Sequence, residues 1–291
     1  MSSYPETRRV EQVDTFHGVD VPDPYRWLEE DVRESEEVAE WVKAQNTVAR
    51  DYLDAIPLRK QIQERLTKLW NFERYSLPTQ TAGKYFYMKN NGLQNQAVLY
   101  VADGFDSPGR VLIDPNTWSE DGTIALGETN ESDDAKLLAY ARKEAGSDWS
   151  TIYVMEVETG KQLDDKLEWV RWGNIVWNAE GTGFFYTRYP QPKEGEQFQS
   201  LATNPAIHFH KLGTPQADDL FVYKRPDEPT WSFWLTRSDD NKFLVLTISR
   251  STDPQNQVLI RQVDAPLEGK FQPLIDDFDN EFSFLGNLGD K

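Results

Sequence analysis

Cysteine is absent from this chain of 291 residues, and histidine occurs only three times. Without cysteine there is no disulfide framework, zinc ribbon, iron–sulfur cluster or thiol nucleophile. No window of the sequence approaches the roughly 20 apolar residues that a membrane helix needs. The first ten residues contain no apolar stretch of signal-peptide length. We therefore expect a cytoplasmic protein with no membrane partner.

Basic side chains are also scarce, because 31 Lys and Arg stand against 49 Asp and Glu, a formal net charge of -18 at pH 7. Like charges repel, so this balance argues against a nucleic acid or an anionic membrane as the main partner. The sequence has no G-x-S-x-G, H-E-x-x-H, P-loop or G-x-G-x-x-G motif. No cofactor is predicted on these grounds.

Two amphipathic segments occupy the chain up to about residue 72. Apolar residues recur at helical spacing over residues 38–52, and acidic residues come early in this segment, where they suit the positive end of a helix dipole. Pro57 ends this pattern, and a second amphipathic segment covers residues 58–70. Residues 21–24 are expected to be non-helical, because a proline disfavours α geometry in the residue before it.

Short strand patterns replace the helical ones from about residue 75 and repeat four times. One strand type begins at residues 84, 136, 183 and 242, and a second begins at 97, 151, 206 and 258. A third strand follows at 111–113, 162–163, 220–222 and 273–275. A fourth precedes the next repeat at 123–126, 174–177, 232–235 and 282–285. Polar turns, such as 132–134 and 238–241, lie where a strand must reverse.

Four strands in roughly 50 residues, repeated along the chain, are typical of a β-propeller. A single blade cannot cover both of its faces, so stacking on its neighbours buries them. The predicted fold class is therefore mainly β: a partial propeller of about four blades over residues 73–291, preceded by an α-helical segment over residues 1–72. A large sandwich or a β-helix stays open as an alternative. Residues 189–204, rich in Pro, Gln, Glu and Gly, predict a mobile surface loop within the third repeat.

Three groups of side chains could in principle support chemistry. His208 and His210 alternate along one strand and so share a face, but no third ligand at a supporting spacing accompanies them. His17 lies beside Gly18 with no nucleophile or orienting acid nearby. The acidic residues 276–281 lack the glycine turn and the terminal spacing of an EF-hand loop. A polar strand face, an extended segment and a solvated turn are the simpler interpretations, and no metal site is predicted.

Several motifs resemble those of the prolyl oligopeptidase family of serine peptidases. They are Phe16-His17-Gly18, Val21-Pro22-Asp23-Pro24-Tyr25-Arg26-Trp27-Leu28-Glu29, Tyr75-Ser76-Leu77-Pro78, Gly146-Ser147-Asp148-Trp149 and Pro226-Asp227-Glu228-Pro229. The resemblance extends over essentially the whole chain. It implies an enzyme that cuts short peptides after proline. Such an enzyme consists of an α/β-hydrolase domain, which includes the N-terminal helical segment, and a seven-bladed propeller inserted after that segment.

The same resemblance places the catalytic Ser, Asp and His in a C-terminal hydrolase domain. No catalytic residue can therefore be assigned in this chain, and we expect an N-terminal fragment that is inactive alone. Its implied partners are short proline-containing peptides and the missing hydrolase domain. By resemblance, Trp172 lines the pocket beyond that of the scissile proline and Val222 lies near the same lining, although both could instead be core residues between blades. Gly127 stands where the family often carries a basic residue that contacts the peptide.

Two functions remain open at this stage. The chain is either the part of a prolyl oligopeptidase that gates access and selects small peptides, or a stand-alone propeller that serves as a binding module without peptidase activity. The reading frame beyond residue 291 distinguishes them. Further blades and a glycine-rich Ser elbow would support the first function, whereas a stop codon would support the second.

Overall fold

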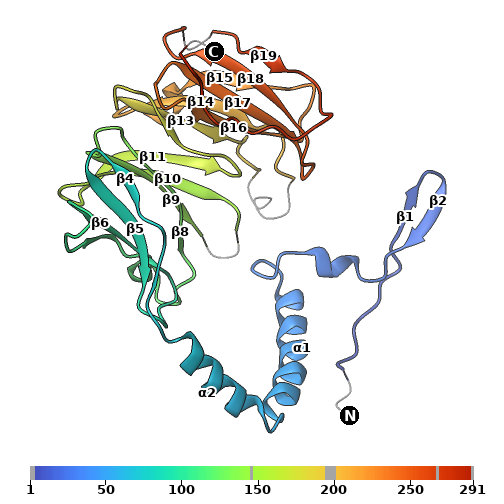
Figure 1. Cartoon of the computed structure of the whole chain (residues 1–291). Helices are drawn as coiled ribbons and strands as arrows, with labels where there is room; N and C mark the ends of the chain where they lie inside the picture. The colour runs from blue at the N-terminus through green and yellow to red at the C-terminus, as the bar shows by residue number, and fades with distance from the viewer. Residues whose placement is uncertain (1–3, 145–146, 194–200, 267–268, 290–291) are drawn as a thin grey trace. The chain divides into compact units, whose positions relative to one another are not determined.

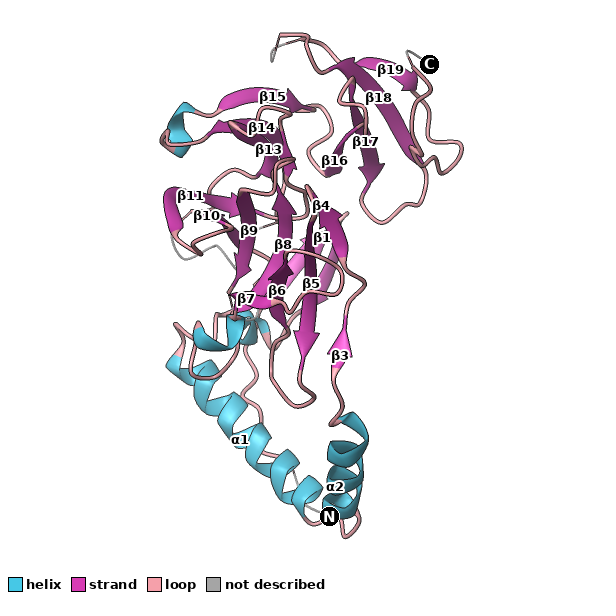
Figure 2. Ribbon diagram, turned by 60° about the vertical axis from the view of Figure 1, so that its left-hand side comes forward, coloured by secondary structure: helices cyan, strands magenta, loops and turns pink. Residues whose placement is uncertain are grey.

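The computed structural model describes residues 4–144, 147–193, 201–266 and 269–289. The chain divides into two compact units, residues 1–71 and 72–291. Both long helices belong to the first unit, and the second consists mainly of strands (Figure 2). Among the residues described, no helix is long and apolar enough to cross a membrane.

The first unit, which we call the helical unit, begins with a hairpin that the sequence analysis did not predict. Its elements are β1 (Val13–Phe16), β2 (Val19–Pro22), the 3-10 helix η1 (Arg26–Glu29), α1 (Glu36–Asp54) and α2 (Arg59–Trp70). The hairpin reverses at His17 and Gly18, whose φ angles of 51° and 80° are both left-handed. Two such residues in succession make the tight turn that matches the twist of paired strands.

The two helices cover the segments with helical periodicity. Helix α1 begins after Ser35, whose side-chain oxygen accepts a hydrogen bond of 3.5 Å from the Val38 amide. Glu36 and Glu37 lie in its first turn, where negative charge interacts favourably with the positive end of the helix dipole. Pro57 lies between the two helices, as predicted from its missing amide hydrogen.

Few side chains are buried in the helical unit. Trp27 and Val38 are its buried apolar residues among those described, and Trp27 meets the edge of Trp41 at 6.4 Å between ring centroids. The indole nitrogen of Trp27 donates to the Arg8 carbonyl at 3.0 Å. Helix α2 buries none of its residues. The apolar stripe of α2 is therefore exposed.

The second unit, the β unit, contains one group of antiparallel strands, or blade, for each predicted repeat (Figure 1). Blade 1 comprises β3 (Arg74–Tyr75), β4 (Thr79–Thr81), β5 (Lys84–Asn90), β6 (Val98–Ala102) and β7 (Arg110–Ile113). Blade 2 comprises β8 (Ala125–Glu131), β9 (Leu137–Lys143), β10 (Ser150–Glu156) and β11 (Gln162–Val170). Blade 3 comprises β12 (Val176–Trp177), β13 (Gly183–Arg188), β14 (Ala206–Lys211) and β15 (Leu220–Lys224). Blade 4 comprises β16 (Trp231–Arg237), β17 (Phe243–Arg250), β18 (Asn256–Gln262) and β19 (Gln272–Ile275).

Two 3-10 helices lie in the connections between strands, and one pair of residues links two blades. The turns are η2 (Pro115–Thr117), after blade 1, and η3 (Gln216–Asp218), between β14 and β15. A single pair, Val170 with Arg188, joins blades 2 and 3 into one sheet. In blades 2 to 4, neighbouring strands follow one another in the chain, which is the meander expected of a propeller blade; in blade 1, β5 pairs with both β3 and β4.

The predicted polar turns use one hydrogen-bond pattern twice. Between β8 and β9, the Ser132 hydroxyl accepts from the Leu137 amide at 3.0 Å, and between β16 and β17 the Ser238 hydroxyl accepts from the Phe243 amide at 2.9 Å. Each serine also donates to the aspartate two residues later at 2.8 Å. Side-chain oxygens thus replace strand partners where the backbone reverses.

Three apolar clusters lie between successive blades. The cluster between blades 1 and 2 contains Phe86 and Leu138, that between blades 2 and 3 contains Ile152 and Phe184, and that between blades 3 and 4 contains Ile207 and Leu246. Alternate residues of a central strand enter different clusters, because successive side chains point to opposite faces of a sheet. This stacking confirms the prediction of a mainly β, propeller-type fold.

One predicted strand is absent. Residues 282–285 form no strand, although their pattern matches the first strand of the other repeats. In blades 2 to 4 the first strand pairs with the strand that follows it in the chain. The described residues after 285 supply no such partner, and an apolar pattern alone cannot form a ladder.

Candidate functional site

The end of β11 and the residues that follow it hold two tryptophans in an uncommon backbone conformation. Trp169 and Trp172 have φ angles of 61° and 42°, in the left-handed region that bulky residues rarely adopt. The Tyr189 amide donates to the Trp169 carbonyl at 2.9 Å, which ties the segment to the end of β13. Gly173 is required here, because a Cβ at this position would lie 2.4 Å from Cβ of Thr187. Backbone strain of this kind persists only where the surroundings impose it, and it concentrates at functional sites.

An aromatic cluster surrounds this segment, and we define it as Trp149, Trp169, Trp172 and Tyr189. The rings meet edge to face, with centroid distances of 5.6 Å for Trp149 and Trp169, 6.0 Å for Trp149 and Tyr189, and 6.3 Å for Trp172 and Tyr189. Such contacts are favourable beyond the area that they bury. Burial raises the pKa of Tyr189 to about 12, so its phenol stays neutral.

Arg171 covers part of the aromatic cluster. Its guanidinium carbon lies 3.8 Å from the ring centroid of Trp172 and 5.2 Å from that of Trp149. Its Nη2 donates to Asp148 at 2.8 Å, whereas its Nε is buried without a hydrogen-bond partner. A cation held against one face of an indole fixes the orientation of the ring.

The structure places the sequence-predicted site residues in different environments. The side chain of Trp172 is 49% exposed at the edge of the aromatic cluster, so part of the indole is accessible. Val222 is buried in the apolar cluster between blades 3 and 4, in agreement with the core role left open above. A contact between peptide and either residue stays a prediction. Lys143 approaches the position of the absent basic residue, because its Cε would lie 3.2 Å from a Cβ at Gly127.

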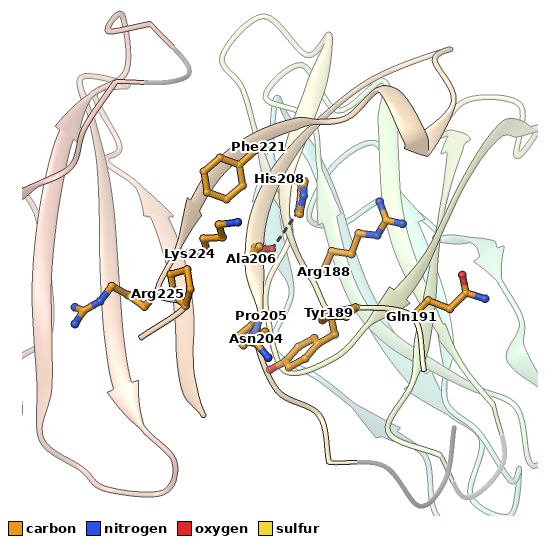
Figure 3. Close-up of a pocket in the computed structure, with 12 residues that line it drawn as sticks. Arg188, Tyr189, Gln191, Asn204, Pro205, Ala206, His208, Phe221, Lys224 and Arg225 are labelled. Carbon is orange, nitrogen blue, oxygen red and sulfur yellow. Dashed lines mark hydrogen bonds between the residues drawn. The ribbon is translucent and has the colours of Figure 1, made fainter. Parts of the chain in front are cut away.

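A pocket of about 340 Å³ adjoins the aromatic cluster through Tyr189, which belongs to both. It lies at one end of β13, β14 and β15 (Figure 3). Its lining residues are Arg188, Tyr189, Pro190, Gln191, Asn204, Pro205, Ala206, His208, Phe221, Lys224, Arg225 and Pro226. Residues from both ends of the predicted loop 189–204 line the pocket. Residues 194–200 of this loop lie outside the described part of the chain. Sequence patterns did not indicate this pocket.

The two histidines of β14 share a face but differ in environment. Nδ1 of His210 donates to Asp219 at 2.6 Å and its Nε2 donates to Asp165 at 3.0 Å, with all three side chains buried. Burial by itself lowers the pKa of His210, but the hydrogen bonds to Asp219 and Asp165 outweigh it and hold this pKa above its ordinary value. Because both ring nitrogens donate, neither is available as a metal ligand, and His210 is a structural cation between blades 2 and 3.

The remaining candidates for metal chemistry have structural surroundings. His17 is the exposed turn residue of the β1–β2 hairpin. Residues 276–281 form bends and coil next to blade 4, where Phe278 packs against Trp231 at 4.9 Å. Within the described ranges, no group of three or more His, Asp or Glu side chains is arranged to hold a metal ion.

Comparison with known proteins connects these features to one family. The model of the family described as prolyl oligopeptidase, N-terminal beta-propeller domain, matches residues 5–291. The chain is 38% identical over 288 residues to a prolyl endopeptidase of Elizabethkingia meningoseptica, covering 99% of this chain and 40% of that protein. It is 33% identical to a dual function macrocyclase-peptidase of Galerina marginata, covering 90% of this chain and 39% of that protein. The chain thus spans about 40% of the length of these relatives.

A solved structure agrees with the sequence comparison. Prolyl oligopeptidase B from Galerina marginata, bound to a 35mer hydrolysis and macrocyclization substrate, superimposes with a TM-score of 0.85 at 30% identity. The match covers 98% of this chain and 43% of that one. With the family model matched over nearly the whole chain, and with blades stacked as the repeats predict, this chain belongs to the prolyl oligopeptidase family, of which it contains the N-terminal β-propeller domain.

Proposed function

We propose that this chain is the N-terminal part of a prolyl endopeptidase, a serine peptidase that cleaves short peptides after proline. In this proposal the β unit selects small peptides and gates their access. The catalytic Ser, Asp and His belong to a C-terminal hydrolase domain outside residues 1–291, and the location is cytoplasmic. The proposal is supported by family membership and by relatives that are named prolyl endopeptidases and are longer than this chain.

The half-exposed indole of Trp172 is the observation that supports peptide selection most directly. Arg171 and Tyr189 hold the ring in place, so a ligand that stacks on it orders little additional protein. Flat aromatic faces are effective contacts for a proline ring, because both are rigid and bury area at low entropic cost. Tryptophan is also enriched among the residues that dominate binding energies.

The exposed stripe of α2 supports the second part of the proposal. Ile62, Leu66, Leu69 and Trp70 are each about half exposed or more in this unit. An apolar stripe of this kind marks a surface that a further part of a protein covers. We assign this surface to the hydrolase domain.

Calorimetric titration with an acetylated, amidated proline-containing pentapeptide tests peptide selection. We expect Trp172→Ala to weaken binding roughly tenfold or more, as for a residue that anchors a ligand. Trp234→Ala is the matched control, because Trp234 is 44% exposed on β16 and lies outside the aromatic cluster. Equal affinities of both variants, or equal affinity for the peptide with alanine in place of proline, would contradict the proposal.

A chromogenic Gly-Pro substrate tests the placement of the catalytic residues. The 291-residue chain alone is expected to leave the substrate intact, because hydrolysis requires an activated hydroxyl beside an oriented base. Turnover that a serine-directed phosphonate blocks would place the catalytic residues within this chain and overturn that part of the proposal.

A further inference from the structure

The pocket at the end of β13, β14 and β15 is positively charged in an acidic protein. Arg188, Lys224 and Arg225 line it, and its lining contains no Asp or Glu. The chain as a whole carries a formal charge of -18. A concave site lined by charges of one sign concentrates the field and attracts the opposite charge. Any ligand that uses this feature is an anion.

Strand register places two of the cations on either side of a small residue. Arg188 pairs with Ala206, and Ala206 pairs with Lys224, so the three positions form a row across β13, β14 and β15. Directly paired residues point to the same face of a sheet. Figure 3 shows Arg188 and Lys224 on opposite sides of Ala206.

Arg188 and Lys224 have no ion-pair partner among the residues that the structure describes. In the part of the chain that the structure describes, neither side chain forms an ion pair, whereas Arg225 is bound by both oxygens of Asp227. The Lys224 ammonium lies 5.3 Å from the ring centroid of Phe221, which positions it beside the pocket. Two cations that lack a counterion within the described ranges are thus available to a ligand.

His208 lies between these cations and responds to their charge. Burial lowers the pKa of His208, the Ala206 carbonyl and the negative charge of Asp219 act against this effect, and the positive charges of Arg188 and Lys224 lower the pKa further. Nδ1 of His208 donates to the Ala206 carbonyl at 3.3 Å (Figure 3). The imidazole is therefore a neutral wall of the pocket.

The other walls favour an organic anion over inorganic phosphate. Pro190, Pro205 and Pro226 contribute no backbone N–H donors, whereas phosphate sites in proteins are commonly cradled by several such donors. Phe221, which is 46% exposed, adds flat apolar surface. Proline and aromatic walls suit the body of a peptide, and the planar fork of Arg188 suits a carboxylate.

We propose that this pocket binds the carboxylate of a peptide, held by Arg188 and Lys224, with the peptide body against Phe221 and the exposed prolines Pro190 and Pro226. The carboxylate comes either from an acidic side chain or from a free C-terminus. The assignment of a peptide as ligand rests on the proposed function, whereas the preference for a carboxylate rests on the pocket alone.

Calorimetry with four acetylated pentapeptides of one proline-containing sequence tests the proposal on the 291-residue chain. Two of them are amidated and differ only in an internal Glu or Gln. The other two contain no acidic side chain and differ only in ending with a free carboxylate or an amide. We expect at least one acid peptide to bind about tenfold or more tightly than its neutral counterpart, as for charge-assisted hydrogen bonds. The acid peptide that binds more tightly shows whether the carboxylate comes from a side chain or from a free C-terminus.

Variants locate the effect. Arg188→Gln and Lys224→Gln should each remove most of the gain from the carboxylate. Lys211→Gln makes the same charge change at the far, exposed end of β14 and should retain it. Equal affinity for acid and neutral peptides, an equal loss in the Lys211→Gln control, or competition by phosphate at least as strong as that by carboxylate would overturn the proposal.

Binding of a small carboxylate tests the pocket independently of the proposed selection of peptides. N-acetylglycine and its amide carry no peptide body, and the imidazole proton signals of His208 report on their binding by NMR. A shift with the acid but not with the amide supports the carboxylate site even if Trp172→Ala shows that peptides are not selected. No shift with the acid at saturating concentration would overturn the carboxylate site itself.

Discussion

The helical unit and the β unit of this chain differ in how far they bury their apolar side chains. In the β unit Leu138, Phe184 and Leu246 are completely buried between blades, whereas in the helical unit Leu66 and Trp70 are 55% and 62% exposed. A helix satisfies its backbone hydrogen bonds internally, so it can form with one face bare. A strand needs neighbours for its backbone, and a sheet needs a second layer for its faces. The comparison indicates that the β unit carries its own core, whereas the helical unit leaves an apolar stripe exposed.

The largest expected contrast concerns charged groups. His210→Ala leaves Asp165 and Asp219 buried without their cation, and we expect the free energy of unfolding of the β unit to fall by about 3–5 kcal/mol. Glu37→Gln removes the ion pair with Arg8, in which both side chains are half exposed. This change should lower the free energy of unfolding by less than about 1 kcal/mol. Urea titration followed by tryptophan fluorescence measures both. Similar losses would show that the two units do not differ in this respect.

Apolar truncations give the next contrast. We expect Leu138→Ala to lower the free energy of unfolding by about 2–5 kcal/mol, because it opens a cavity between blades 1 and 2. Leu66→Ala on α2 should change it by no more than about 0.5 kcal/mol, because the leucine is already exposed. A large loss at Leu66 would mean that the stripe of α2 is covered in solution. Sedimentation would then reveal whether a second copy covers it.

A pH-dependent contrast is smaller. Burial raises the pKa of Glu128 on β8 to about 7, from an ordinary value of 4.5. The folded state therefore binds more protons between these pH values, and stability falls as the pH rises from about 4.5 to about 7. Glu128→Gln cannot ionise, and its amide oxygen can still accept from the Ile175 amide, as Glu128 does at 3.0 Å. We expect this variant to be more stable than the original chain by about 1–3 kcal/mol at pH 8.5 and nearly equal at pH 5.

Melting temperatures at the two pH values test this expectation. Glu40→Gln in α1 is the matched control, because Glu40 is an exposed carboxylate of the helical unit. It should change the melting temperature little at either pH. A stabilisation by Glu128→Gln that is the same at pH 5 and pH 8.5 would contradict the role of ionisation.

The elements that sequence patterns predicted are those with regular periodicity. The two helical segments and the repeated strands occur where the spacing of apolar residues indicated. The hairpin of β1 and β2 was missed because each strand has only four residues and is almost wholly exposed, so no buried face marks it in the sequence. Strands β3 and β4 were missed because each is very short. Residues 282–285 show the reverse error, since they have the pattern of a strand but no partner.

The candidate site was less predictable than the fold. Trp172 was named through a family resemblance, and the left-handed backbone that presents it has no sequence signal beyond the adjacent Gly173. The contact of His210 with Asp165 joins residues 45 positions apart, on different blades. The pocket between Arg188 and Lys224 depends on strand register. No spacing rule connects such positions.

The amino-acid sequence alone determined that this protein has two amphipathic helices followed by repeated four-stranded units, because both depend on the local period of apolar residues. It also determined the overall negative charge. Only the tertiary structure decided which faces are covered, where Trp172 and Val222 lie, and that two cations flank Ala206 in one pocket. The physical reason is that stacking and register bring together residues whose separation along the chain carries no information about their contact.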